Sequence, residues 1–152
     1  MILVIQRVQR ATVRNLETGE ERAIGPGLVV LVGFERGDTP AVFPKVVRKV
    51  YHLRVFEDEQ GKLNRSLQDL GYEVLWVSNF TLAGSIDRGR RPDFFRAMPF
   101  DEARQRFEEL LAEARRQGFP AVAGFYGAHM AVELVNDGPV TLVWHLPPEA
   151  GS

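Results

Sequence analysis

Residues 25–33 read GPGLVVLVG, and this short stretch decides the fold. Glycine and proline at positions 25–27 interrupt regular structure, and the residues at 28–32 that follow are all apolar. A strand with one face in water alternates apolar and polar side chains, whereas a continuous apolar run fits a strand buried on both faces. The pattern therefore predicts that residues 28–32 form the central, buried strand of a β-sheet.

The segment before this strand also has the character of β-structure. Residues 2–8 are rich in β-branched side chains, and residues 11–14 lead into the sequence ETGE at 17–20. That sequence predicts a hairpin turn before a further strand at 22–24.

The segment after the central strand predicts a helix. Pro40 suits its first turn, with a cap near Asp38 or Thr39, whereas Pro44 is expected to delay the start of the helix. The side chains expected to face the core are Phe43, Val46, Val47, Val50 and Leu53.

The rest of the chain continues this mixture of strands and helices. The patterns predict a short strand at 54–56, a turn at 57–61, a strand at 73–80, an amphipathic helix at 101–117 that ends before Gly118, and strands at 131–135 and 140–144 joined by a turn at 136–139. Strands gather at both ends without regular βαβ alternation. We therefore expect one α+β domain over residues 1–152, with a mostly antiparallel sheet and two main helices.

Composition excludes several classes of protein. There is no cysteine, which excludes disulfides, thiolate metal sites and a cysteine nucleophile. The 19 basic and 20 acidic residues give a net charge of -1, which argues against a protein that coats nucleic acid but not against one that holds only its end. No apolar run is long enough for a signal peptide or a membrane span, so we expect a soluble cytoplasmic protein.

The usual catalytic constellations are also missing. His52, His129 and His145 are isolated, without the spacing of metal ligands, and each is expected to be an ordinary surface or core histidine. Residues 25–27 lack the lysine and hydroxyl residue of a phosphate-binding loop, and no Gly-x-Ser-x-Gly motif occurs. The sequence therefore predicts no metal and no cofactor.

Three polar segments stand out against this background. Residues 78–82 read SNFTL at the end of a predicted strand, which fits either a site for donor groups or an ordinary strand terminus. Residues 136–141 read NDGPVT, which fits a plain turn. Arg88, Arg90 and Arg91 lie on a Gly/Pro loop and suit either phosphate contact or a solvated loop.

Taken together and in this order, these segments resemble the D-aminoacyl-tRNA deacylase family. The resemblance covers nearly the whole chain and is carried by residues 6–8, 25–33, 54–64, 78–82, 88–94 and 127–141. It implies an enzyme that hydrolyses the ester between the tRNA 3′ end and a D-amino acid or glycine. It also implies a homodimer with active sites at the interface, where a cis Gly138–Pro139 peptide of one subunit enters the site of the other.

The resemblance assigns roles to individual residues. Ser78, Phe80 and Thr81 line the catalytic site, and backbone N–H groups around residues 79–81 bind the ester oxyanion. The residues it assigns to catalysis are Ser78, Asn79, Phe80 and Thr81. Those assigned to substrate binding are Arg7, Tyr126, Met130, Asn136, Gly138, Pro139 and Thr141, of which Arg7 braces the Gly138–Pro139 loop and Tyr126 and Met130 contact the terminal adenine.

Three hypotheses follow. In the first, the chain is a deacylase without a protein nucleophile, and the 2′-hydroxyl of the terminal ribose assists the attack. This fits the absence of a histidine or carboxylate next to Thr81 in sequence. In the second, Asn79, which replaces the family's usual Gln, has left a binding module without activity. In the third, Thr81 is the nucleophile of a general esterase.

Overall fold

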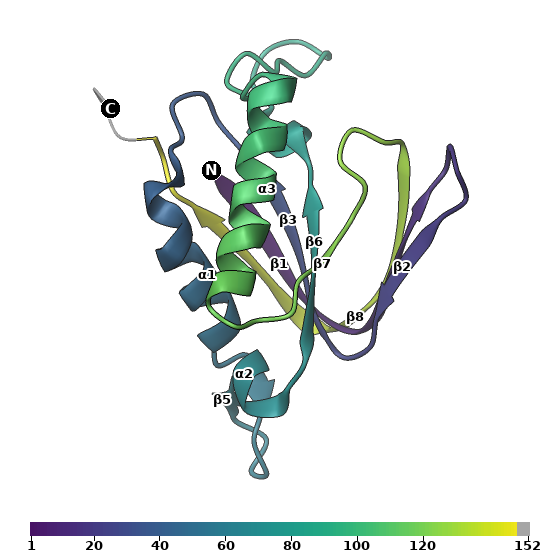
Figure 1. Cartoon of the computed structure of the whole chain (residues 1–152), viewed down its shortest axis with the longest axis vertical. Helices are drawn as coiled ribbons and strands as arrows, with labels where there is room; N and C mark the ends of the chain where they lie inside the picture. The colour runs from purple at the N-terminus through teal and green to yellow at the C-terminus, as the bar shows by residue number, and fades with distance from the viewer. Residues whose placement is uncertain (149–152) are drawn as a thin grey trace.

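Six strands form one sheet in the computed structural model, which describes residues 1–148, and two short strands form a separate hairpin. The strands are β1 (Ile2–Asn15), β2 (Glu21–Ile24), β3 (Gly27–Gly33), β4 (Phe56–Glu57), β5 (Leu63–Arg65), β6 (Glu73–Ser78), β7 (Val122–Ala123) and β8 (Met130–His145). The helices are α1 (Phe43–His52), α2 (Leu67–Leu70) and α3 (Phe100–Arg116), with 3-10 turns at Pro40–Val42 and Phe80–Ala83. Figure 1 shows α1 and α3 on one face of the sheet.

The long strand β1 is paired along both of its edges. β8 runs antiparallel to it from one end to the other. Because β8 occupies that whole edge, β3 and β2 share the opposite edge, where β3 pairs with residues 2–8 and β2 with residues 11–14. The path of β1 is therefore fixed by three neighbouring strands.

The α+β class and the central position of β3 are confirmed, but the sheet is mixed. β3 pairs with β6, and β6 with β7, in parallel, whereas every pair that involves β1 is antiparallel. Parallel neighbours need a crossover connection. Here α1 and the segment after it connect β3 to β6, and α3 connects β6 to β7. The sequence analysis missed these crossovers because the first is long and irregular.

Both faces of β3 are buried, as its apolar run predicts. Leu28, Val30 and Val32 pack with α1 and α3 in one core, whereas Val29 lies in a second core on the opposite face. The second core also contains Val8, Ala11, Val13, Ile24, Leu75, Val77 and Phe125. The sheet is thus covered on one side by helices and on the other by its own curled end. None of the helices within residues 1–148 has the length and apolar character needed to cross a membrane.

Gly27 allows β3 to approach β6 closely at the start of their pairing. A Cβ atom at this position would lie 1.9 Å from the carbonyl oxygen of Glu73. A side chain is therefore incompatible with the register between these two strands.

The two main helices lie close to where they were expected. α1 begins at Phe43, after a separate 3-10 turn at Pro40–Val42, so Pro44 falls in its first turn. Its buried residues include Tyr51, which the sequence analysis did not single out, and Leu53 lies just beyond its end.

Three local predictions were wrong. The short strand lies at Phe56–Glu57 rather than at 54–56, and β5 and α2 were not expected. The turn predicted at 136–139 does not reverse the chain, because residues on both sides of it pair with β1 and β8 is one continuous strand. Turn-forming residues here produce a bulge, since β1 offers partners on both sides.

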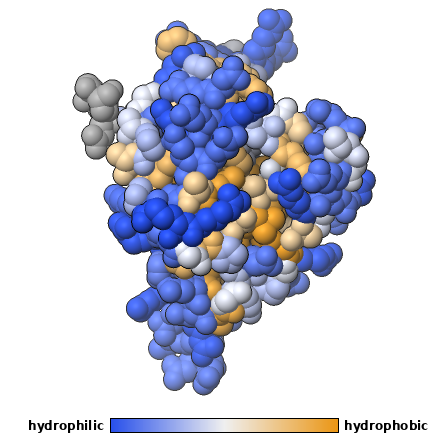
Figure 2. Space-filling model, in the orientation of Figure 1, coloured by the Kyte–Doolittle hydropathy of each residue, from blue (hydrophilic) through white to orange (hydrophobic). Residues whose placement is uncertain are grey.

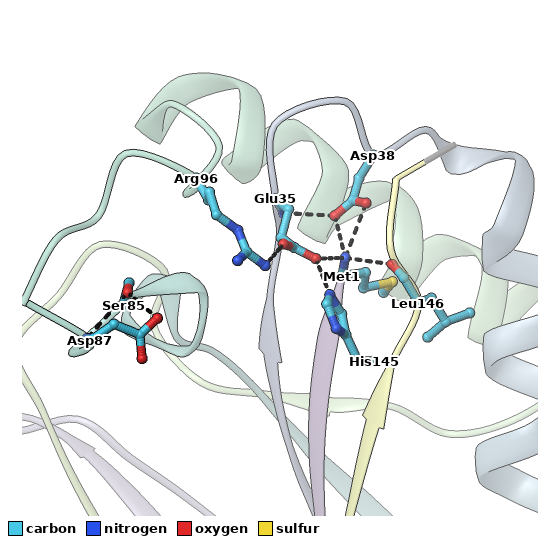
Figure 3. A network of polar contacts seen from close by, with 8 residues as sticks. All are labelled: Met1, Glu35, Asp38, Ser85, Asp87, Arg96, His145 and Leu146. Atoms are coloured by element: carbon cyan, nitrogen blue, oxygen red, sulfur yellow. Dashed lines mark hydrogen bonds and ion pairs between the residues drawn. The ribbon is translucent and has the colours of Figure 1, made fainter. Parts of the chain in front are cut away.

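A buried ionic network ties the start of β1 to the end of β8 (Figure 3). The ammonium group of Met1 lies 2.8 Å from Glu35 Oε1 and 2.9 Å from Asp38 Oδ2. Glu35 also accepts hydrogen bonds from Arg96 at 2.8 Å and lies 2.6 Å from His145 Nε2. Burial alone would raise the pKa of Glu35, but the hydrogen bonds from Met1, Arg96 and His145 prevail and lower it to about 2.

Replacement of Glu35 by glutamine should therefore lower the free energy of unfolding at pH 7. We expect a loss of about 2 kcal/mol, less than the pKa shift alone corresponds to, because Arg96 is largely exposed. The contribution of a carboxylate with a lowered pKa is complete above its unfolded-state pKa and is lost as the pH falls through the folded-state pKa. The difference between the two proteins in urea unfolding should thus shrink between pH 4.5 and about 2.

Glu59→Gln is the matched control, because the side chain of Glu59 is 90% exposed. A difference between wild type and Glu35→Gln that stays constant over this pH range would contradict the assignment.

Candidate functional site

An apolar cavity of about 740 Å³ opens between the end of β6 and the segment that leads into β8. Figure 2 shows apolar side chains gathered in a hollow between the part of the molecule that carries α3 and the part that carries β2. The cavity is lined by Leu31, Val77, Ser78, Asn79, Phe80, Phe94, Ala97, Met98, Phe100, Tyr126, Gly127, Ala128, His129, Met130, Val132 and Leu134. Few of these side chains are polar, so the cavity suits an aromatic or aliphatic group.

The polar part of the cavity is the turn that follows β6. Ser78 is the last residue of this strand, and the N–H of Asn79 continues the ladder by donating to Val32 O at 2.8 Å. The chain then turns through the 3-10 segment Phe80–Ala83. A rigid parallel pair of strands thus holds this turn at the cavity wall.

The side chain of Asn79 caps this turn. Its Oδ1 accepts hydrogen bonds from the N–H of Thr81 at 3.1 Å and from the Thr81 hydroxyl at 2.5 Å. An amide oxygen is not a base at neutral pH, so this contact orients the hydroxyl without activating it as a nucleophile.

Backbone donors at the turn are fewer than the sequence analysis expected. The N–H of Asn79 is used by β3, and that of Thr81 by the Asn79 side chain. Among residues 79–81, only the N–H of Phe80 donates to no other atom of residues 1–148. A single backbone donor is therefore free for a ligand here.

Tyr126 and Met130 form the facing wall, as the resemblance implies. The Tyr126 hydroxyl donates to Phe100 O at 2.6 Å, and Met130 Sδ accepts from the N–H of Phe125 at 3.3 Å. Burial raises the pKa of Tyr126 above its ordinary value of 10, although the nearby Arg104 guanidinium opposes the shift. The hydroxyl therefore stays protonated and fixes the ring at neutral pH.

The other predicted site residues lie elsewhere, on the ladder between β1 and β8. Gln6 pairs with Thr141 and Val8 with Asn136, so four residues of β8 bulge out opposite Arg7 alone. The bulge contains Gly138 and Pro139, both exposed, and the peptide bond between them is cis, as the resemblance implies.

Arg7 and Asn136 hold this bulge in place. Arg7 is only 6% exposed and donates from Nε to Asp137 O and from a terminal nitrogen to Val55 O, both at 2.8 Å. Asn136 Nδ2 donates to Arg7 O at 2.9 Å, where the ladder is interrupted. Their side chains are thus committed to the protein itself.

The structure therefore divides the predicted residues into two groups. Ser78, Asn79, Phe80, Tyr126 and Met130 line the cavity, whereas none of the bulge residues does. Thr81 stands just behind the lining. Within residues 1–148, no group of three histidine or acidic side chains is placed to hold a metal ion.

The sequence analysis missed the cavity residues that come from the loop before α3. The rings of Phe80 and Phe94 are 5.2 Å apart, and Phe100 is 55% exposed beside the cavity. The only signal in the sequence was the presence of apolar aromatic residues in a segment that is otherwise rich in arginine, glycine and proline.

Comparison with known proteins gives consistent results. The family model described as D-Tyr-tRNA(Tyr) deacylase matches residues 4–145. A protein of Heliobacterium modesticaldum named D-aminoacyl-tRNA deacylase is 54% identical over 94% of this chain and 95% of its own. One of the same name from Azoarcus sp. is 47% identical over the full length of both.

Solved structures agree on the fold. A structure titled c-Myc DNA Unwinding Element Binding Protein superposes with a TM-score of 0.88 at 41% identity and covers 97% of this chain and 99% of its own. A probable eukaryotic D-amino acid tRNA deacylase superposes with a TM-score of 0.81 at 15% identity, over 94% of this chain and 97% of its own.

Replacement of Arg7 by alanine should destabilise the protein through the bulge. Its loss leaves the carbonyl groups of Asp137 and Val55 without their donors, which is expected to lower the free energy of unfolding by about 2–3 kcal/mol. Arg14→Ala on the same strand is the control, since Arg14 is 56% exposed and pairs only with Glu21. Equal losses for the two variants in urea unfolding would contradict this view of Arg7.

Proposed function

The matches to known proteins show that the chain belongs to the D-Tyr-tRNA(Tyr) deacylase family, and we propose how its cavity carries out the reaction. The chain is a hydrolase of D-aminoacyl-tRNA esters. Our proposal is that it also releases glycine, and that the ribose 2′-hydroxyl of the terminal adenosine assists hydrolysis. The alternative of a binding module without activity finds no support among these relatives.

One observation carries the proposal: the turn at Ser78–Thr81 and the wall formed by Tyr126 and Met130 share one cavity. An aromatic ring and a thioether suit contact with a purine base. With the adenine of the 3′ end against that wall, the ester is expected to lie at the turn, across the cavity.

The turn supplies one fixed donor for the reacting ester. As water attacks the carbonyl carbon, negative charge develops on the carbonyl oxygen, and the free N–H of Phe80 is placed to stabilise it. The bond from that carbon to the ribose 3′ oxygen then breaks. The products are the free amino acid and a tRNA whose 3′ oxygen has taken up a proton.

Thr81 is not the nucleophile in this proposal. Its hydroxyl donates to Asn79 Oδ1 rather than to a histidine or a carboxylate, so no base is in place to remove its proton. The vicinal 2′-hydroxyl of the substrate lies next to the ester, where it can hydrogen-bond to the attacking water or to the leaving oxygen.

A second copy of the chain completes the site. The bulge with Gly138 and Pro139 is exposed and braced from beneath by Arg7, yet it contributes nothing to the cavity of its own chain. β8 also exposes Val132, Leu142 and Val143 by 38%, 40% and 69%. We propose that these faces meet in a symmetric dimer, and that the bulge enters the partner's cavity and blocks the side chain of an L-amino acid.

Hydrolysis should depend on the chirality of the amino acid and on the 2′-hydroxyl. D-tyrosyl-tRNA and glycyl-tRNA should be deacylated rapidly, and L-tyrosyl-tRNA should be spared. A 2′-deoxy terminal adenosine should lower the rate by about 100-fold or more, which is the usual range for a lost proton-transfer or hydrogen-bonding group. Release of labelled amino acid at matched enzyme concentrations measures all four rates.

Thr81→Ala separates this mechanism from that of an esterase with a threonine nucleophile. The variant should keep most of the wild-type rate, because Thr81 only shapes the turn. Loss of nearly all activity in this variant, together with full activity on the 2′-deoxy substrate, would favour the esterase.

Mixing two inactive variants tests whether the site is shared between subunits. One carries Tyr126→Ala and Met130→Ala in the cavity, and the other lacks Gly138 and Pro139. Co-refolding equal amounts should restore about a quarter of the wild-type rate, since half of the dimers are mixed and each has one intact site. If the mixture stays inactive while both variants fold and dimerise, the bulge does not act on the partner's cavity.

A further inference from the structure

An aromatic and cationic cluster forms the rim of the cavity where α3 begins. Phe100 and Tyr126 both line the cavity, with ring centroids 5.1 Å apart. Gly127 permits this arrangement, because a Cβ atom there would lie 2.6 Å from Phe100 Cζ, and its φ of 74° is one that glycine adopts without strain.

Arg104 covers both rings from the next turn of α3. Its guanidinium carbon lies 5.1 Å from the ring centroid of Phe100 and 5.4 Å from that of Tyr126. Stacking on two rings fixes the plane of the guanidinium but leaves the N–H groups at its edge available.

The charge of Arg104 is not used inside the protein. Within residues 1–148 it donates no hydrogen bond and has no carboxylate partner within 4 Å. Two other arginines of the same helix are paired, Arg106 with Glu109 and Arg116 with Glu113. A preorganised, unpaired cation at the edge of an apolar cavity is suited to an anionic group of the ligand.

We propose that Arg104 binds the phosphate that joins the terminal adenosine to the nucleotide before it. This subsite rests on the proposed function, in which the adenine lies against Tyr126 and Met130. The cavity lining is largely apolar, so it accepts the base and the aminoacyl group, whereas a phosphate must stay outside. Arg104 lies just beyond the rim, behind the ring that faces the adenine.

The guanidinium also suits phosphate chemically. Its parallel N–H groups form two hydrogen bonds to two phosphate oxygens, which a lysine ammonium does with less geometric definition. The protein as a whole is nearly neutral, with a net charge of -1, so attraction of the tRNA 3′ end requires such local cations. A phosphate held here would fix the nucleotide along the rim and help to orient the ester at the turn.

Binding of two small ligands tests the subsite without requiring catalysis. Wild-type protein should bind adenosine 5′-phosphate about tenfold more tightly than adenosine at low salt, and the difference should shrink as salt is added. In Arg104→Ala the two ligands should bind with nearly equal affinity, whereas Arg104→Lys should recover part of the preference. Arg116→Ala, at the far end of the same helix, should behave as wild type.

Kinetics on short esters provide the second readout. Arg104→Ala should raise KM about tenfold for the D-tyrosyl ester of cytidylyl-3′,5′-adenosine, which carries one phosphodiester, with little change in kcat. KM for D-tyrosyl-adenosine, which carries no phosphate, should stay within about twofold of wild type. If wild type hydrolyses neither ester, the proposed function fails, while the ligand-binding comparison still decides on the phosphate subsite.

Three outcomes would overturn the subsite. Equal weakening of both ligands by Arg104→Ala would mean that Arg104 only supports the ring of Tyr126. An unchanged preference for the phosphate in that variant would place the anion elsewhere. Loss of the preference in Arg90→Ala instead would assign the phosphate to the loop at residues 88–91.

Discussion

The pairing of β1 along both of its edges is the constraint on which the rest of the molecule depends. Its N–H and C=O groups are used by β8 on one side and by β3 and β2 on the other, so the strand cannot slip without breaking two ladders. β3 in turn positions β6, whose end forms the turn at the cavity. Where the outer ladder is interrupted, at Arg7, the bulge of β8 is formed. Both parts of the proposed site are thus set by one strand.

The chemistry of the cavity follows from which hydrogen bonds remain unused. At the turn after β6, Asn79 and Thr81 satisfy each other, and only Phe80 keeps a free backbone donor. At the rim, Tyr126 is fixed by its hydrogen bond to Phe100 O, and Arg104 keeps its charge unpaired within the described residues. A protein with nearly balanced charge can therefore still present a cation and a donor at defined points. Both lie on rigid elements, which reduces the ordering needed when a ligand binds.

Elements with strong local signals were predicted well, and elements that depend on distant partners were not. The apolar run at 28–32 and the amphipathic pattern at 101–117 each specify their own structure, and β3 and α3 lie there. The sequence at 136–139 has the composition of a turn, but β1 holds the chain on both sides of it in one direction. Parallel pairing of β3 with β6 was not foreseen, because no local pattern marks a crossover of irregular structure.

The sequence by itself determined the class of fold, the absence of thiol chemistry and the two polar motifs, because these depend on residue type and local spacing. It also carried the resemblance that the family comparison confirms. Only the tertiary structure decided that the turn at Ser78–Thr81 shares a cavity with Tyr126 and Met130, while Arg7 and Asn136 support a bulge elsewhere. It alone brought Phe100 and Arg104 to the rim of that cavity. The reason is physical: these residues are far apart along the chain, and they meet only when strand pairing and helix packing have closed both cores.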